Sequence, residues 1–306
     1  MKSLRYITDA AMTTALVVVI LLISHYTGAE IEEMFPFLLP IPLALYVMRY
    51  DWKKGLIPFF AITAISLIHN PLHGLFFVAF GNVMGLLYGA FLYHHVKKAW
   101  RLLIAVVGSF FINFLSLWVF SKLLYGYTIY EDLQRAVASL FSHLSIDNTS
   151  LQSLMEAVVK GLVPSILFLF SLLEGFLFHF LTSILSFRIF HHETDIEQHG
   201  FHLRVHPVLT ILYLPICILS FVFLTSFPNM TEFWKYIWMI GMNLTLIGGF
   251  FYIIESLLFF SLLARQFHKP WIYILSCLGI LLFPIHWLIG MADSFYPLHL
   301  LLLRFH

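Results

Sequence analysis

Charged residues are scarce in this sequence, since Asp, Glu, Lys and Arg together make up only 11% of its 306 residues. A soluble domain usually carries about a quarter charged residues, so the shortage excludes an ordinary water-facing surface. The formal net charge of +1 and the lack of a long basic stretch exclude a nucleic-acid partner. Cysteine is also scarce. Cys217 and Cys277 both lie in apolar runs, which excludes a disulfide framework.

The common sequence signatures of hydrolytic enzymes are missing. The sequence contains no G-x-x-x-x-G-K-[S/T] loop, no H-E-x-x-H and no G-x-S-x-G. We therefore expect a protein that is not an enzyme, needs no cofactor and does not itself hydrolyse ATP.

Apolar residues are abundant instead, at 60% of the chain, and Phe alone occurs 33 times. A soluble core of this size could not hide so much apolar surface, so lipid must cover part of it. The sequence predicts an all-α polytopic membrane protein with about nine transmembrane helices. The apolar segments are residues 8–28, 35–48, 56–68, 74–93, 102–124, 161–187, 207–227, 235–263 and 271–290. The second and third are short, and we expect them to be tilted, partly re-entrant or extended by their flanks.

The first apolar segment follows Lys2 and Arg5, a pattern that a secretory signal peptide shares. Its length is that of a full span, however, and no A-x-A-like cleavage site follows it. We interpret it as a retained first transmembrane helix.

Basic residues predict the orientation of these spans. Twelve of the 17 basic residues fall on one side under the nine-span arrangement: Lys2, Arg5, Arg49, Lys53, Lys54, Lys97, Lys98, Arg101, Arg188, Arg204, Arg265 and Lys269. The positive-inside rule then places the N-terminus in the cytoplasm and the C-terminus outside. For a bacterial chain the membrane would be the plasma membrane.

The longest stretch between spans, residues 125–160, is predicted to lie on the outer side. Thr128 and Glu131 form a capping box, and Thr149 and Gln152 form a second. Each box precedes an apolar stripe at helical spacing, so amphipathic surface helices are expected at about 128–160. The predicted organisation is a six-helix membrane core at 1–190, a three-helix region at 207–290 and a short outer tail at 291–306.

Small residues at a spacing of four mark two helices. Ala11 and Ala15 share one face of the first span, where another helix could approach closely, either within the chain or from a partner. Gly81, Gly85 and Gly89 form a longer face on the fourth span, and we expect this face to pack against a neighbouring helix of the same chain.

Polar residues inside the predicted spans are few. Glu174 lies near the middle of the sixth span and Glu255 lies in the eighth, while Asn82, Asn113 and Asn243 occupy the fourth, fifth and eighth. A charge at the bilayer centre costs about 2.5–3.5 kcal/mol on insertion scales, so such residues face a bundle interior or a wet cavity. For the asparagines we favour hydrogen bonds between helices. For Glu174 a structural role and a ligand-binding role are equally favoured.

Histidines at metal-ligand spacing occur at His69 and His73, in the outer turn between the third and fourth spans. Complete metal sites usually need three or four ligands, and only two are local here. His202 and His206 show the same spacing on the opposite side. We therefore predict no metal site.

Two levels of family resemblance follow from these residues. The segment Arg5-Tyr-Ile-Thr-Asp-Ala-Ala, the run Leu39-Pro-Ile-Pro-Leu and the turn Tyr-Asp-Trp-Lys-Lys-Gly resemble the YybS-like bacterial membrane proteins of unknown function. The arrangement of residues 1–190, with its alanine pair and short second and third spans, resembles the S-components of energy-coupling-factor transporters. Spans 7 to 9 are an addition that six-helix S-components lack.

The S-component resemblance implies capture of a small molecule, such as a vitamin, outside the cell. It also implies release through a membrane coupling subunit with separate ATPases. It gives Ala11 and Ala15 a partner-contact role and suggests a pocket lined by Glu30, Glu32, Glu33, His69, Asn70 and His73, together with Asn82, Asn113 and Glu174. The alternative is a membrane scaffold that binds a protein partner and transports nothing, as the S-component-like cell-shape protein MreD does. An intramembrane enzyme is a third class, supported only by Glu174 and scattered histidines.

Overall fold

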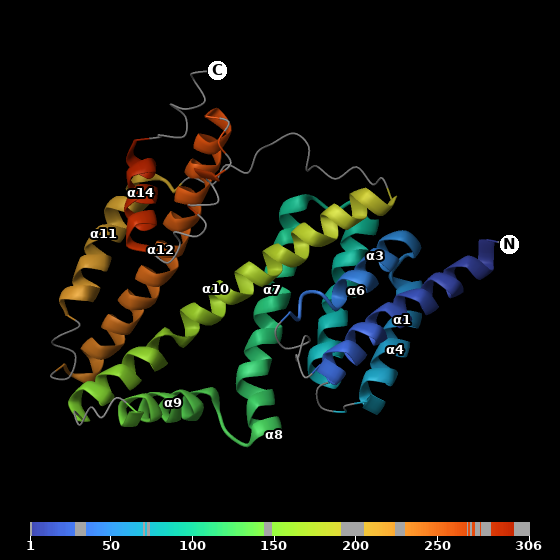
Figure 1. Cartoon of the computed structure of the whole chain (residues 1–306), viewed down its shortest axis with the longest axis horizontal. Coiled ribbons are helices and arrows are strands. Elements are labelled where there is room, and N and C mark those ends of the chain that lie inside the picture. The colour runs from blue at the N-terminus through green and yellow to red at the C-terminus, as the bar shows by residue number, and fades with distance from the viewer. Residues whose placement is uncertain are drawn as a thin grey trace. The chain divides into compact units, whose positions relative to one another are not determined.

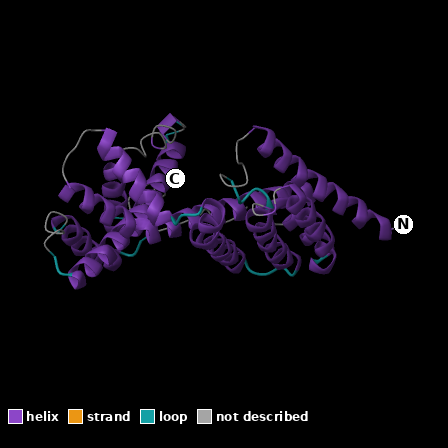
Figure 2. Cartoon of the chain, turned by 90° about the horizontal axis from the view of Figure 1, so that it is seen from below, coloured by secondary structure: helices purple, strands orange, loops and turns teal. Residues whose placement is uncertain are grey.

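The computed structural model describes residues 2–27, 35–69, 71, 74–143, 149–190, 205–223, 230–267, 269, 271–272, 276 and 283–296. Within these ranges the regular structure is helical and no strand occurs, as Figure 1 and Figure 2 show. The prediction of an all-α chain is confirmed for this part of the sequence.

Two compact units make up the chain. Unit 1 comprises Met1–Asp132 and Phe170–Glu197, and unit 2 comprises Leu133–Leu169 and Gln198–His306. The 42-residue helix α10 (Thr149–Phe190) contributes its first half to unit 2 and its second half to unit 1. The division predicted at residue 190 stays a prediction.

Unit 1 begins with α1 (Lys2–Thr27), α3 (Pro40–Tyr50) and α4 (Trp52–His69), followed by the π-helical turn η1 (Gly74–Ala79), which leads into α6 (Phe80–Tyr93). It continues with α7 (Lys98–Leu115), a second π-helical turn η2 (Ser116–Phe120) and the short α8 (Ser121–Tyr125). Helix α1 packs against α4, and α3 packs against both α6 and α4. The end of α10 completes a core around Tyr88 and Phe178.

The turn between α3 and α4 is tight. Asp51 ends α3 with φ at 77° and ψ at 156°, a strained backbone conformation for a residue that carries a Cβ. Its carboxylate accepts the Trp52 N–H at 2.7 Å and so satisfies a donor at the start of α4.

Unit 2 contains α9 (Ile129–His143) from Leu133 onward, the first half of α10, α11 (Pro207–Val222), α12 (Glu232–Gln266) and α14 (Phe283–Phe295). Helix α12 packs against α11 and α14. A cluster of Tyr213, Cys217, Tyr252 and Met291 forms a core among these three helices.

Described helices overlap the predicted spans, the ninth only from Phe283 onward, but only some of these helices are long enough to cross a bilayer. Among the described residues, four helices are long and apolar enough to cross a membrane: Leu4–Thr27, Lys98–Leu123, Met155–Phe190 and Phe233–Ala264. Phe77–Tyr93 and Pro207–Val222 are apolar but shorter. The 11 residues of α3 cover about 16 Å, roughly half of a hydrocarbon core, so this helix does not cross by itself. The chain is a multi-pass membrane protein, while nine full crossings are not shown.

The two predicted surface helices differ in outcome. The capping box of α9 forms, with the Thr128 N–H donating to Glu131 Oε2 at 2.9 Å and the Glu131 N–H donating to Thr128 Oγ1 at 3.4 Å. The second helix is not separate. Residues 149–160 are the first turns of α10 and continue through Pro164 into the predicted sixth span.

Candidate functional site

A polar cluster lies where α7 meets α10 in unit 1. Asn113 of α7 donates from Nδ2 to Glu174 Oε2 at 2.6 Å and to Ser171 Oγ at 3.2 Å. The helices approach closely because α10 presents Gly175 to α7. A Cβ added to Gly175 would lie 2.6 Å from the Val106 Cα. Two of the predicted site residues, Asn113 and Glu174, are therefore direct hydrogen-bond partners.

The second carboxylate oxygen of Glu174 is open. The side chain is only 4% exposed, and Oε1 is buried with no hydrogen-bond partner among the described residues. A carboxylate offers about four acceptor positions, whereas the Asn113 amide and the neighbouring helix backbone supply few donors. The group therefore keeps unused capacity to accept hydrogen bonds.

A small cavity borders Glu174. Its wall is formed by the segment that begins α3, by α6 and by α7, through Pro36, Phe37, Pro40, Gly81, Met84, Ser109 and Ile112. About 10 Å³ of it is open to the centre of a water molecule, which is room for about one water. The space beside Gly81 on the α6 wall is empty, since a Cβ added there would meet no atom within 4 Å.

Asn82 is fully buried but is not bonded to this cluster. Its Nδ2 donates to the Val78 carbonyl at 2.8 Å, one turn back within η1 and α6, and its Oδ1 has no partner among the described residues. The wide turns of a π-helix leave helix carbonyls without their usual donor, and a side-chain donor compensates. Ser121 does the same for Leu117 within η2. Of the three intramembrane residues predicted to line the pocket, the structure thus joins Asn113 and Glu174 and leaves Asn82 separate.

A second buried pair lies further along α10. Tyr88 of α6 and His179 of α10 share a hydrogen bond of 2.7 Å between the phenol oxygen and Nδ1, and both side chains are at most 5% exposed. Sequence reasoning missed this pair. The signal that could have found it is His179 itself, an ionisable residue deep inside a predicted span.

The three glycines of α6 have different neighbours. A Cβ added to Gly85 would lie 2.7 Å from the Pro40 carbonyl oxygen, and one added to Gly89 would lie 2.6 Å from that of Ala44. Both glycines therefore allow the backbones of α6 and α3 to touch. Gly81 instead borders the Glu174 cavity.

Ala11 and Ala15 are exposed on α1, beside Met12 and Leu16, which are 66% and 53% exposed. The neighbouring residue Ala10 is the one that packs inward, at 3% exposure. The predicted alanine face therefore lies on the outside of unit 1.

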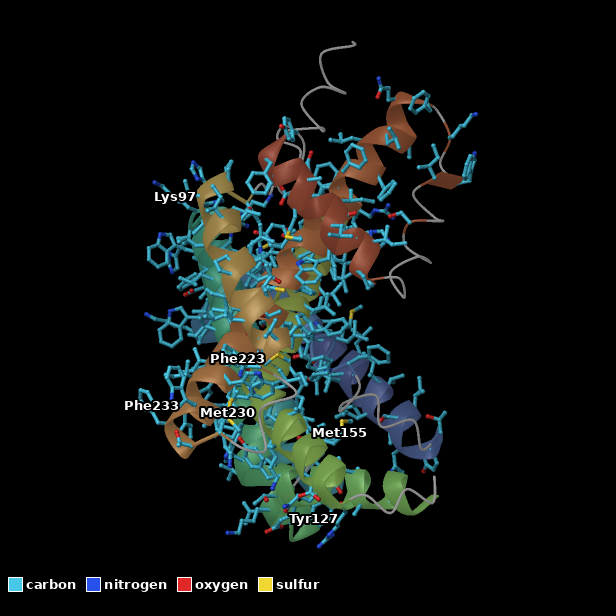
Figure 3. All side chains as sticks on the ribbon, turned by 90° about the vertical axis from the view of Figure 1, so that its left-hand side faces the viewer. Lys97, Tyr127, Met155, Phe223, Met230 and Phe233 are labelled. Atoms are coloured by element: carbon cyan, nitrogen blue, oxygen red, sulfur yellow. The ribbon has the colours of Figure 1, made fainter. Side chains whose placement is uncertain are left out.

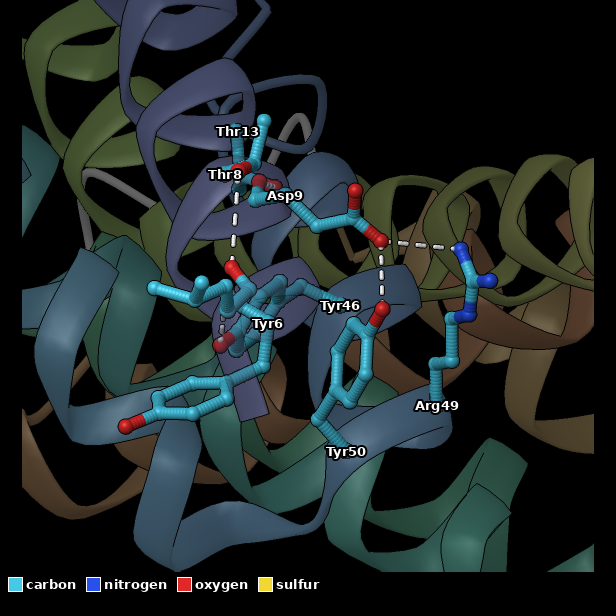
Figure 4. Close-up of polar contacts among 8 residues, drawn as sticks. Tyr6, Thr8, Asp9, Thr13, Tyr46, Arg49 and Tyr50 are labelled. Atoms are coloured by element: carbon cyan, nitrogen blue, oxygen red, sulfur yellow. Dashed lines mark hydrogen bonds and ion pairs between the residues drawn. The ribbon is translucent and has the colours of Figure 1, made fainter. Parts of the chain in front are cut away.

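One end of α1 is fastened to α3 by the polar contacts drawn in Figure 4. Asp9 accepts from Arg49 at 2.9 Å and from the Tyr50 phenol at 2.5 Å. The Tyr46 phenol donates to the Tyr6 carbonyl at 3.1 Å. Burial, and then the hydrogen bond to Asp9, raise the pKa of the Tyr50 phenol, so this phenol remains a donor at neutral pH.

Most of the predicted outer pocket lies outside the described residues, namely Glu30, Glu32, Glu33, Asn70 and His73. His69 is the last residue of α4. Among the residues that the structure describes, no group of three or more His, Cys, Asp or Glu side chains could hold a metal ion.

Unit 2 has its own buried amide and larger cavities. Asn243 of α12 donates to the Gly161 and Met239 carbonyls, both at 2.7 Å, and its Oδ1 accepts from the N–H and hydroxyl of Ser165. A groove between α11 and α12 has about 680 Å³ open to the centre of a water molecule, with an almost entirely apolar lining. Phe223 and Met230, labelled in Figure 3, mark one end of it.

Comparison with known proteins gives one family match. A family model described as "Predicted membrane protein (DUF2232)" matches residues 15–294. No curated protein and no solved structure matches the chain. The match is consistent with a YybS-like membrane family and supplies no link to the S-components.

Proposed function

We propose that this chain, which belongs to the DUF2232 family of predicted membrane proteins, is a non-catalytic membrane subunit that captures a small molecule for uptake, in the manner of an S-component. The observation that carries this proposal is the open oxygen of Glu174 beside a cavity. Lipid supplies no hydrogen-bond partner, so a polar atom left unbonded inside a membrane bundle is costly unless water or a ligand reaches it. An acceptor left open beside a space fits a ligand.

The chemistry of the site narrows the ligand class. Glu174 Oε1 is an acceptor, and the Ser109 hydroxyl at the same cavity can donate or accept. Phe37, Met84 and Ile112 form apolar walls. The proposed ligand is a small, largely apolar molecule with a hydrogen-bond donor or a positive charge, a description that covers several vitamins.

Capture requires the cavity to widen, because its present volume holds about one water. The wall contributed by Pro36 and Phe37 precedes α3 and is the non-helical part of the lining. We place the entrance there, on the side that the basic residues predict to be outside. The predicted acids Glu30, Glu32 and Glu33 precede this segment in the chain.

Release would need a partner, and α1 offers a surface for one. Ala11 and Ala15 expose a small-residue face of the kind that lets a second membrane helix approach closely. A coupling subunit with separate ATPases is the proposed partner. The same face also suits the second candidate, an MreD-like scaffold that binds another membrane protein and carries no ligand.

The test combines a search for bound ligand with one substitution. The wild-type protein is purified in a mild detergent, and small molecules released on denaturation are identified by mass spectrometry. We expect a single enriched compound. Glu174→Gln should reduce its retention by about tenfold or more, since it removes a charge-assisted hydrogen bond. It should change the free energy of unfolding by less than about 1 kcal/mol, because Gln still bonds Asn113.

The matched control is Glu131→Gln, which makes the same chemical change in the exposed capping box of α9. It should leave ligand retention unchanged. A wild-type protein that carries no compound while a membrane protein copurifies would favour the scaffold. Full ligand retention by Glu174→Gln would remove the proposed site.

A further inference from the structure

Arg101 is a buried cation in unit 1 whose Nε has no hydrogen-bond partner among the described residues. It lies on the inward stripe of α7 with Ala105, Ser109 and Ile112, and it is 8% exposed. The Asp9–Arg49 ion pair does not involve it. Arg101 therefore lies on the inward side of α7, and no described carboxylate is paired with it.

The carboxylate of Glu174 is too far away to serve. Glu174 bonds to Asn113, which lies twelve residues beyond Arg101 on the same helix, or about 18 Å along its axis. The groups that act electrostatically with Arg101 are Tyr88 and His179, and Lys98 acts on His179 as well. None of these supplies a negative charge that could compensate the guanidinium.

A guanidinium keeps its positive charge in proteins. A lysine in the same place could neutralise. A buried charge without a partner is destabilising, and since no described carboxylate pairs with Arg101, a bound anion would compensate this charge.

The surroundings of Arg101 suit an anion. Helix α7 begins one turn before it, and the first N–H groups of a helix have no acceptor within the helix. The first turn has no acidic residue, Lys97 precedes it without a side-chain cap, and Lys98 lies within it. Cations at this end are disfavoured by the helix dipole, whereas an anion is stabilised by it. Figure 3 labels Lys97 at this start of α7.

The level in the membrane indicates which anion is available. Trp100 is 59% exposed on the same turn, and tryptophan side chains concentrate at the headgroup level of a bilayer. A guanidinium binds phosphate oxygens through two parallel N–H donors. We propose that Arg101, Lys98 and the first turn of α7 bind a phosphate group, supplied by an anionic phospholipid of the leaflet at this end of α7.

The proposed phosphate site at Arg101 is independent of the proposed uptake function, because its residues and its ligand differ from those of the Glu174 cavity. A failure of ligand capture at Glu174 would not contradict phosphate binding at Arg101.

The experiment uses the full chain, delipidated in a neutral detergent. Phosphatidylglycerol, phosphatidylcholine or inorganic phosphate is added back, and binding is followed by native mass spectrometry and by the shift in apparent melting temperature. Wild type should bind phosphatidylglycerol about tenfold more tightly than phosphatidylcholine. Inorganic phosphate should protect only weakly. Equal protection by phosphate would support the phosphate site and identify the free ion as its ligand.

Variants separate a binding role from a structural one. Arg101→Gln should lose about tenfold in affinity for phosphatidylglycerol, and Arg101→Lys should retain part of it, since Lys keeps the charge without the paired donors. Lys53→Gln, at an exposed cation of α4, is the matched control and should bind as wild type does. In the absence of anionic lipid, Arg101→Gln should melt at or above the wild-type temperature, because it removes an unpaired buried charge.

The opposite result has a clear meaning. If Arg101→Gln lowers the melting temperature equally with and without phosphatidylglycerol, a counter-ion within the chain holds Arg101, and the proposal is wrong. Equal binding of phosphatidylglycerol and phosphatidylcholine by the wild type would also overturn it.

Discussion

Buried asparagines in the two units of this protein are satisfied to different degrees. In unit 2, Asn243 uses both amide donors and its oxygen. Its bonds to Gly161 and Ser165 tie α12 to α10, and its bond to the Met239 carbonyl stays within α12. In unit 1, Asn113 bonds a carboxylate whose other oxygen is open, and Asn82 leaves its own oxygen open. Depth in a membrane helix therefore does not by itself determine how fully a buried amide and its partners are hydrogen-bonded.

Cavity size separates the units in the opposite direction. Unit 2 has the groove of about 680 Å³ between α11 and α12, while the cavity at Glu174 measures about 10 Å³ by the same measure. The large groove is lined almost wholly by apolar side chains, and the Trp238 N–H beside it already donates to the Ser220 carbonyl at 2.8 Å. An apolar lining of this kind suits lipid acyl chains better than a polar ligand. Cavity volume alone therefore favours unit 2, whereas the acceptor of the proposed site lies in unit 1.

The largest expected effect concerns membrane topology, namely the sides of the membrane on which α9 and the start of α7 lie. Single cysteines at Ser142 and Lys98, in a background without Cys217 and Cys277, should react in an all-or-none manner with an impermeant reagent in intact cells. Ser142 should label and Lys98 should not. Labelling of both would contradict the predicted topology, and labelling of Lys98 alone would reverse it and move the proposed entrance to the other side.

A large loss of stability is expected where α6 touches α3. Gly85→Leu would force a side chain into a space where even a Cβ lies 2.7 Å from the Pro40 carbonyl oxygen, and should cost about 3 kcal/mol of unfolding free energy. Gly81→Ala is the matched control on the same helix and should be tolerated, because it enters the cavity. Equal losses in both variants, measured by unfolding in mixed micelles, would contradict this distinction.

An intermediate loss of stability is expected when the buried asparagines Asn243 and Asn82 are replaced. Asn243→Ala removes several interhelical hydrogen bonds at about 0.6 kcal/mol each and should destabilise unit 2 by about 2 kcal/mol. Asn82→Ala removes one bond within its own helix and should cost well under half as much. Thermal unfolding of the two variants in the same detergent compares them directly. An equal cost would mean that Asn82 has partners beyond Val78.

The smallest effect on stability is expected on α1. Replacing both Ala11 and Ala15 with Leu adds bulk to an exposed face, so the free energy of unfolding should change by less than about 0.5 kcal/mol. The same variant should lose any copurifying membrane partner, because the close helix approach is blocked. Retention of the partner together with wild-type stability would show that this face binds nothing.

The sequence predicted where the helices lie more accurately than what they contact. The fourth predicted span, 74–93, coincides with η1 and α6, and the seventh begins at Pro207 as predicted. Apolar periodicity and proline carry that information. It does not show that residues 149–160 join the sixth span, because a capping box predicts a helix start whether or not the preceding chain forms a loop.

The site was predicted in part for a similar reason. Spacing along a helix places Asn113 and Glu174 at similar depths, and the structure makes them partners. The depth of Asn82 is similar as well, yet its amide turns back to its own helix. Rotation of each helix about its axis decides this outcome, and a run that is hydrophobic on all sides gives little signal for rotation. The same lack of a rotation signal explains why the Tyr88–His179 pair was not predicted.

The shared helix α10 has a consequence for how the protein is made. Unit 1 is discontinuous, since Phe170–Glu197 follows residues of unit 2 in the order of synthesis. The ribosome must therefore add the whole stretch from Leu133 to Leu169 before Asn113 meets Glu174. Until then the α7 amide is in the membrane without its carboxylate, a situation that favours transient pairing with other polar groups or with the insertion machinery. A chain released at residue 169 would contain most of the helices of unit 1 and lack the carboxylate that its buried amide requires.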